Sequence, residues 1–256
     1  MNTGDNAFIL ICSALVFFMT PALAFFYGGM VRRKNVLNTI MACVGVMGLS
    51  VVMWVMCGYS FAFGPDHLGL IGGLKYFFLN GIDFNSTSPY APTLSATTFV
   101  IFQMMFAMIT PALITGSVVG RIRFPALMLF IALWSLIVYY PLAHMVWGAG
   151  GMIAKWGAVD FAGGNVVHIS SGVSGLILAA FLGKRRGVEH VSYRVHNIPF
   201  VFLGAGILWF GWFGFNAGSA LAANGLAAHA FLTTTLSAAA ALLSWMAIDV
   251  LKEGKP

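Results

Sequence analysis

Residues 7–31 read AFILICSALVFFMTPALAFFYGGMV, an uncharged apolar stretch that is followed directly by Arg32, Arg33 and Lys34. A helix rises about 1.5 Å per residue, so about 20 apolar residues cross the hydrocarbon core of a bilayer. This stretch therefore predicts a transmembrane helix, and the basic cluster marks its end.

Six further apolar stretches of comparable length follow. We predict seven transmembrane helices, over residues 7–31, 38–63, 95–119, 124–145, 164–183, 198–222 and 226–251. The composition agrees, because 60% of the 256 residues are hydrophobic and 8% are charged, whereas soluble domains carry about 25% charged residues. Membrane β-strands would be shorter and would alternate apolar with polar residues. We expect an all-α transmembrane bundle that forms one domain over residues 1–256.

The lysines and arginines of the loops indicate the orientation, because cytoplasmic loops carry an excess of them. With the N-terminus outside, only Lys75 and Lys155 fall in outer loops. The basic residues that then fall inside are Arg32, Arg33, Lys34, Arg121, Arg123, Lys184, Arg185, Arg186, Arg194, Lys252 and Lys255. We therefore expect a multi-pass protein of the inner or plasma membrane with an external N-terminus. Topology and lipid contact explain the net charge of +6, and no nucleic-acid partner is expected.

Ionisable residues inside membrane spans are costly, which makes each one a candidate for function. His168 lies well inside the fifth span, and helical spacing puts Gly164, Ser171, Gly172 and Gly175 on its face. An imidazole among such small residues should have open space or a close neighbour beside it. A hydrogen-bonded packing histidine is the alternative interpretation.

Asp160 directly precedes the fifth span at the spacing of a helix cap, so its carboxylate is expected to accept from the Gly163 amide. A fixed negative charge there would also favour an approaching cation. His144, His229 and Asp249 lie near span ends, where we expect them to reach interfacial water.

Aromatic residues form a third group. Phe102 and Phe106 are four residues apart and share a face of the third span, while Trp147 begins the loop after the fourth span and Phe215 lies in the sixth. Each taken singly is explained by packing or by an interfacial aromatic belt. Together they could form a cation–π cage at the mouth of a path.

Several of these stretches resemble the Amt/Mep/Rh ammonium transporter family. The matching sequences are FYGG at 26–29, HMVWG at 144–148, DFAGG at 160–164, VVHI at 166–169 and GWFGFNAGS at 211–219. The resemblance implies the family fold, in which two inverted five-helix repeats enclose a path and an eleventh helix follows. This chain would supply the first repeat and two helices of the second, so we expect a truncated form of that fold. A family glutamate before Arg121 is replaced by Gly120.

The resemblance also implies roles for individual residues. Trp147, Phe106 and Ser219 would recruit ammonium at an outer vestibule, and Phe106 and Phe215 would form an aromatic gate below it. His168 would be the first pore histidine. Asp160, treated above as a cap, would organise the vestibule and the fifth span.

The chemistry of ammonium suits these groups. An aromatic cage holds a cation by about 1–2 kcal/mol per ring when partly desolvated, whereas burying the intact ion in a dry lumen costs tens of kcal/mol on a Born estimate. Neutral ammonia avoids most of that cost. The expected function is therefore ammonium transport by recruitment, deprotonation near the gate, and passage of ammonia through a hydrophobic pore that contains a histidine.

The resemblance leaves partners and alternatives open. It implies a homotrimer, contact with membrane lipid, and a PII-type signalling protein as a candidate cytoplasmic partner, without a cofactor or a metal. An ammonium sensor coupled to a cytoplasmic signalling domain would share the same vestibule. An unrelated gas or water channel is a third interpretation, and an enzyme is the least favoured because no nucleophile–base pair or phosphate-binding loop is found.

The orientation is tested by labelling from outside the cell. A cysteine at position 75 should react with a membrane-impermeant reagent, because Lys75 lies in an outer loop. A cysteine at position 185 should react only after the membrane is opened. The reverse pattern would contradict the external N-terminus.

Overall fold

Seven helical segments long and apolar enough to cross a membrane dominate the computed structural model, which describes residues 1–185 and 194–254. They are Thr3–Met30, Arg33–Phe63, Ala96–Val118, Phe124–Lys155, Gly164–Leu182, Ile198–Gly218 and Gly225–Glu253. Each overlaps one predicted span, so the prediction of an all-α transmembrane bundle is confirmed. Arg186 and Lys255, which were counted among the inner basic residues, lie outside the described residues.

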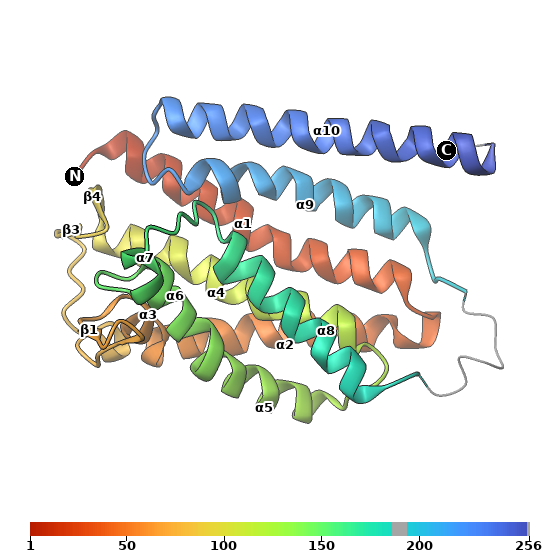
Figure 1. The fold of residues 1–256 in the computed structure, drawn as a ribbon, viewed down its shortest axis with the longest axis horizontal. Coiled ribbons are helices and arrows are strands. Elements are labelled where there is room, and N and C mark those ends of the chain that lie inside the picture. The colour runs from red at the N-terminus through yellow and green to blue at the C-terminus, as the bar shows by residue number, and fades with distance from the viewer. Residues whose placement is uncertain (186–193, 255–256) are drawn as a thin grey trace.

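Figure 1 shows the order of the elements. The long helices are α1 (Thr3–Met30), α2 (Val36–Met53), α4 (Ala96–Val118), α5 (Phe124–Trp134), α6 (Tyr140–Trp147), α8 (Ser170–Leu182), α9 (Ile198–Gly218) and α10 (Gly225–Glu253). Three π-helical turns are found in the described residues: η2 (Trp54–Gly58), η4 (Ser135–Tyr139) and η5 (Gly164–Ile169). They lead into α3 (Tyr59–Phe63), α6 and α8, respectively.

The remaining elements are short. A 3₁₀ turn, η1 (Arg33–Asn35), precedes α2. Between α3 and α4 lie the antiparallel pairs β1 (Asp66–His67) with β2 (Ile71–Gly72) and β3 (Thr87–Ser88) with β4 (Ala91–Ser95), and a 3₁₀ turn, η3 (Phe77–Leu79). The one-turn helix α7 (Met152–Lys155) follows α6.

Side-chain caps mark where four of the long helices begin. Asn2, Ser95, Asn197 and Asn224 each accept backbone N–H groups of the following turn, at 2.9–3.2 Å. The first amides of a helix have no partner within it, so these oxygens satisfy donors that would otherwise be exposed to a poorly hydrated layer. The caps therefore fix the helix starts of α1, α4, α9 and α10.

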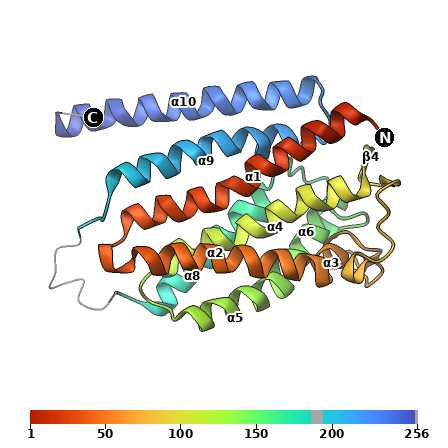
Figure 2. The same cartoon turned by 180° about the vertical axis from the view of Figure 1, so that it is seen from behind.

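The closest helix packing joins α1 to α9, and both ribbon views place α9 between α1 and α10 (Figures 1 and 2). Glycines allow it. A Cβ atom on Gly204 would lie 2.5 Å from the Phe26 nitrogen, and one on Gly214 would lie 2.7 Å from the Cys12 oxygen. Small residues at such contacts let helices gain dispersion contacts in lipid. Gly218, paired with Gly214 by sequence spacing, packs in the same interface against Cys12.

Arg121 joins the C-terminal ends of α4 and α8. Its Nη1 donates to the carbonyl oxygens of Ala179 at 3.1 Å and Gly183 at 2.7 Å, and its Nη2 donates to the Ser117 carbonyl. Gly120 turns the chain with φ +71°, a conformation that favours glycine. The Arg121 guanidinium is thus occupied by carbonyl oxygens near the ends of both helices.

Two of the π-helical turns face each other across neighbouring helices. The rings of Trp54 in η2 and Tyr140 after η4 lie 5.9 Å apart, and a Cβ on Gly58 would lie 2.6 Å from Tyr140 Cζ. Both turns therefore contribute to one buried aromatic contact.

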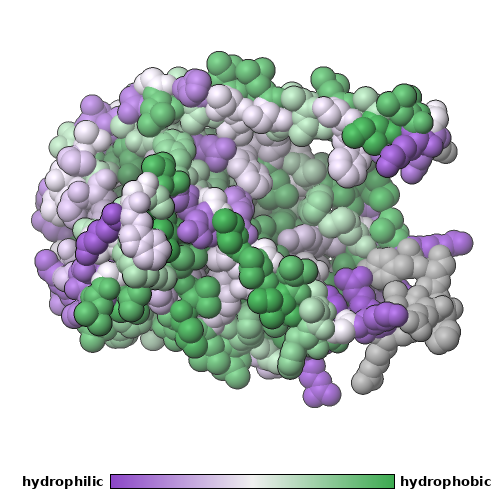
Figure 3. Space-filling model, viewed as in Figure 1, coloured by the Kyte–Doolittle hydropathy of each residue, from purple (hydrophilic) through white to green (hydrophobic). Residues whose placement is uncertain are grey.

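The outer surface fits a lipid environment. Apolar side chains cover the long flanks, whereas hydrophilic ones gather toward the two ends (Figure 3). Large apolar residues such as Ile137, Leu176, Phe181 and Leu243 are exposed. Exposed apolar surface of this extent is unusual for a soluble monomer. The chain is a multi-pass membrane protein.

The glycine contact between α1 and α9 predicts a difference between two substitutions on the same helix. Gly214→Ala would press a methyl group on the α1 backbone and should destabilise the protein by about 1–3 kcal/mol. Gly206→Ala is the matched control, because no atom lies within 4 Å of its added Cβ. Thermal unfolding in detergent should show a lower midpoint for Gly214→Ala only. Equal midpoints would contradict the tight contact.

Candidate functional site

The start of the fifth span is held by one carboxylate. Asp160 Oδ1 accepts the amides of Gly163 at 2.6 Å and Gly164 at 2.8 Å, and Oδ2 accepts those of Asn165 at 2.8 Å and Val166 at 3.0 Å. The predicted bond to Gly163 is confirmed, with three more beside it. The helical turn that follows, η5, is π-helical, a form found frequently at functional sites. Asp160 thus fixes the segment that carries His168.

Trp147 is the last residue of α6 and lies between two partners. Its Nε1 donates to the backbone oxygen of Asp160 at 2.9 Å. Its ring meets Phe106 edge to face, with centroids 6.1 Å apart and planes at 86°. The indole is thereby fixed in both position and orientation.

Phe106 and Phe215 form the centre of the site. Their ring centroids lie 4.5 Å apart, and both side chains are almost fully buried. Phe102 meets Phe106 edge to face at 4.9 Å, as expected from their shared face of α4. Rings this close leave no continuous space between α4 and α9 at this level.

His168 lies next to this pair but faces a groove. Its ring is stacked on Trp212 at 5.6 Å and 16°, and its centroid is 5.7 Å from that of Phe215. The helical segment that carries it begins with η5 at Gly164, the predicted start of the fifth span. The analysis of the sequence missed Trp212, although its spacing of three residues from Phe215 puts both on one face of α9.

Two cavities lie on opposite sides of the chain of rings Trp147–Phe106–Phe215–His168. We call them the outer cavity and the inner groove, after the orientation predicted from the loops. The outer cavity has a volume of about 330 Å³, and Phe106, Trp147, Asp160 and Ser219 are among its lining residues. The inner groove, of about 470 Å³, is lined by His168 with Tyr27, Ser117, Ser171, Gly172 and Gly175, among others. Three of the small residues predicted to share the face of His168 are therefore in this groove.

Ser219 follows the end of α9 in the loop to α10. Its Oγ donates to the Phe215 carbonyl at 2.8 Å, which leaves the hydroxyl oxygen free to accept a further hydrogen bond. The same loop is held from α1, because the Ala223 amide donates to Asp5 Oδ1 at 2.8 Å. Asp5 is 8% exposed and was not singled out in the sequence.

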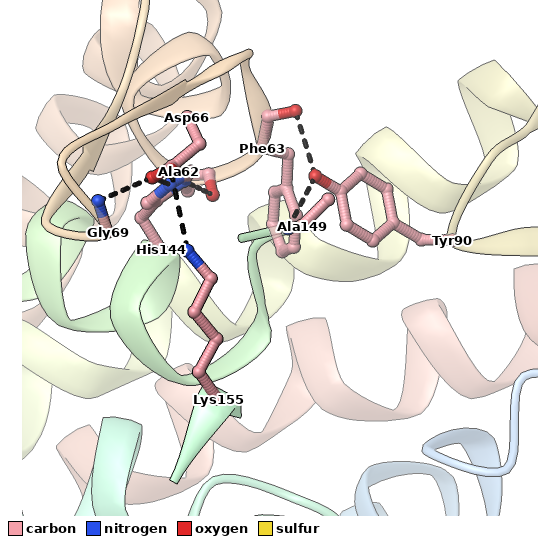
Figure 4. Close-up of polar contacts among 8 residues, drawn as sticks. All are labelled: Ala62, Phe63, Asp66, Gly69, Tyr90, His144, Ala149 and Lys155. Atoms are coloured by element: carbon pink, nitrogen blue, oxygen red, sulfur yellow. Dashed lines mark hydrogen bonds and ion pairs between the residues drawn. The ribbon is translucent and has the colours of Figure 1, made fainter. Parts of the chain in front are cut away.

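The expectation that His144 reaches interfacial water is wrong. Its side chain is fully buried, with Nδ1 at 3.0 Å from the Ala62 carbonyl oxygen and Nε2 at 3.0 Å from Asp66 Oδ1 (Figure 4). The Gly69 amide and the Lys155 ammonium approach the same carboxylate, at 2.7 Å and 3.8 Å. The hydrogen bond from His144 is the main cause that lowers the pKa of Asp66 below its ordinary value, and Gly69 and Lys155 add to it.

Comparisons with known proteins identify the family of the chain. A model of the Ammonium Transporter Family matches residues 7–256. An ammonium transporter of Mycobacterium tuberculosis (strain ATCC 25618 / H37Rv) is 50% identical over 98% of this chain and 57% of its own length. The solved structure of Candida albicans Mep2 is 32% identical, with a TM-score of 0.92 over 100% of this chain and 57% of that one.

A solved chain described as a sensor Amt protein is 29% identical, with a TM-score of 0.89 over 98% of this chain and 63% of that one. This chain therefore spans a little more than half the length of the relatives that it matches. The curated relative is named as a transporter rather than an enzyme. Because the family model covers nearly every residue and the fold agrees, the chain belongs to the ammonium transporter family.

Proposed function

We propose that the protein carries ammonium nitrogen across the cell membrane. Ammonium is recruited in the outer cavity and loses a proton near the aromatic gate, and ammonia then passes His168. The observation that carries this proposal is the unbroken chain of rings from Trp147 through Phe106 and Phe215 to His168, with a cavity on each side.

Recruitment rests on Trp147, Phe106 and Ser219, which line the outer cavity together. Two aromatic faces attract a cation, each by about 1–2 kcal/mol when partly desolvated. The Ser219 oxygen accepts one N–H of ammonium. Potassium has a similar size but no N–H donor, so the hydroxyl favours ammonium over potassium.

The gate determines which species continues. Phe106 and Phe215 are buried and lie in contact, so an intact ion between them would lose its hydration without a charged partner. That desolvation is far more costly than the cage can offset. The ammonium ion therefore transfers a proton to water in the outer cavity, and the neutral molecule passes the gate.

His168 receives the neutral molecule in the inner groove. A neutral imidazole offers one donor and one acceptor, which match the lone pair and the N–H groups of ammonia. Asp160 takes part indirectly, because both of its oxygens already accept backbone amides. It organises the vestibule through η5 and through Trp147.

The orientation, assembly and partner of the protein are proposed from the charges of its loops and from its family. The basic residues favour an external N-terminus, so the Trp147 cavity opens outward. We propose that residues 1–256 form one transmembrane domain of a protein that assembles as a homotrimer in the lipid bilayer. A PII-type protein is the proposed partner on the cytoplasmic face.

A second candidate function is ammonium sensing. The structural match to a chain described as a sensor Amt protein favours it, since the outer cavity would serve both roles. Ammonium-dependent flux through the purified full-length protein separates the two. A sensor would bind ammonium without such a flux.

Trp147→Leu tests recruitment. The substitution keeps apolar bulk but removes an aromatic face, so the ammonium concentration for half-maximal transport should rise about fivefold or more. Trp156→Leu, at an exposed indole beyond the cavity, is the control and should change it little. Concentration-dependent uptake in proteoliposomes measures both. An unchanged value in Trp147→Leu, with normal expression, would count against the cage.

His168→Asp tests the groove. A fixed negative charge beside Phe215 would let the groove hold an intact cation, so the variant should conduct potassium and lose its preference for ammonium. If His168 only packs, the variant should either fail to fold or keep its ion preference. Potassium flux through purified, correctly assembled protein distinguishes these two roles of His168. Background potassium flux with surviving ammonium flux would rule out His168 as the filter.

A further inference from the structure

The hydrogen-bonded pair of buried His144 and partly exposed Asp66 lies outside the chain of rings, yet it is attached to the turn that carries Trp147. His144 is three residues before Trp147, on the last turn of α6. The helix ends there because Gly148 is in an extended conformation, although its amide still donates to the His144 carbonyl at 2.8 Å. A shift of the His144 ring would therefore also shift the backbone turn from which the Trp147 indole projects.

Both imidazole nitrogens point at acceptors. The Ala62 carbonyl can only accept, so Nδ1 donates to it. Nε2 lies 3.0 Å from Asp66 Oδ1, which also accepts from the Gly69 amide. The ring is fully buried and is thus held by an α3 carbonyl on one side and a β1 carboxylate on the other. A buried histidine in this setting is fixed in rotation as well as in position.

The glycines after Trp147 allow the backbone to pass close to this pair. A Cβ on Gly148 would lie 2.5 Å from His144 Nδ1, and one on Gly150 would lie 2.9 Å from Asp66 Oδ2. The Met152 amide donates to the Gly69 carbonyl at 2.9 Å and closes the Asp66 turn against α7. The backbone after Trp147 is therefore folded tightly over the pair.

A second contact holds the other side of Trp147. The Tyr90 hydroxyl accepts from the Ala149 amide at 3.2 Å and donates to the Phe63 carbonyl at 3.1 Å (Figure 4). Trp147 thus stands between two attachments to the segment Ala62–Tyr90, one through His144 and one through Ala149. On its cavity side, the hydrogen bond to Asp160 and the edge-to-face contact with the Phe106 ring restrain it.

We propose that His144 and Asp66 are positioning residues for Trp147: their hydrogen-bonded pair fixes the last turn of α6 so that the indole stands over Phe106. The proposal rests on the proposed function, in which that indole recruits ammonium. Neither residue touches the cavity. Losing the pair should therefore weaken capture of ammonium and leave the maximal rate nearly unchanged.

The test uses full-length protein in proteoliposomes and three substitutions of Asp66, whose side chain is 28% exposed. Asp66→Ala removes the acceptor and should raise the half-saturating ammonium concentration about fivefold, as Trp147→Leu does. Asp66→Asn should keep the wild-type half-saturating concentration, because a carboxamide can accept from or donate to Nε2. Asp66→Glu displaces the carboxylate by one methylene and should give an intermediate value, which keeps the test informative if Asp66→Ala does not assemble.

His67→Gln is the matched control, because His67 is the exposed neighbour of Asp66 in β1. It should leave the half-saturating concentration unchanged. The double variant Asp66→Ala with Trp147→Leu should be no worse than Trp147→Leu alone, since residues that act through one another are not additive. Additive effects would overturn the proposal, and so would Asp66 variants with wild-type half-saturation beside an impaired Trp147→Leu.

A structural measurement separates this proposal from the proposed function. In a cryo-EM structure of Asp66→Ala, the indole of Trp147 should have moved from its edge-to-face position 6.1 Å from Phe106. An unmoved indole overturns the positioning role. A moved indole with unchanged ammonium capture in both Asp66→Ala and Trp147→Leu supports the positioning role and counts against the recruiting role of Trp147.

Discussion

The carboxylate of Asp160 accepts four backbone amides and so begins the fifth span in a π-helical turn. Its own backbone oxygen accepts the Trp147 indole. Asp160 therefore sets the distance between the Trp147 ring and His168. In a layer with almost no water, four unpaired amides would be far too costly to leave exposed. The hydrogen bonds of Asp160 that satisfy the helix end are thus the same ones that place the site.

The other half of the site depends on the contact between α1 and α9. Gly214 and Gly218 bring α9 against Cys12, and a Cβ on Gly218 would also lie 2.8 Å from the Phe102 ring. Phe215 lies between these glycines and is turned toward Phe106. The two glycines therefore have two roles. They allow the helices to come into contact in lipid, and they set the depth at which the aromatic rings meet.

The sequence predicts the seven spans well because each is a long apolar run, and bilayer thickness leaves few alternatives. The bond from Gly163 to Asp160 was also predictable, because it is local. Contacts between distant segments were not. His144 was expected to face water because its partner Asp66 is 78 residues earlier, and nothing near His144 indicates it. Asp5 likewise receives its bond from a residue 218 positions away. Periodicity reports which face is apolar, but not which partner it meets.

The facing turns η2 and η4 have a consequence for how this fold changes over evolution. A π-helical turn contains about one residue more than an α-helical turn, and one residue corresponds to about 100° of helix rotation. Trp54 begins η2 and Tyr140 directly follows η4, so the contact of their rings lies beside both additional residues. Deleting a single residue from one helix would turn the rest of that helix by the same angle and bring its buried face toward lipid. The two insertions are therefore expected to be inherited as a pair.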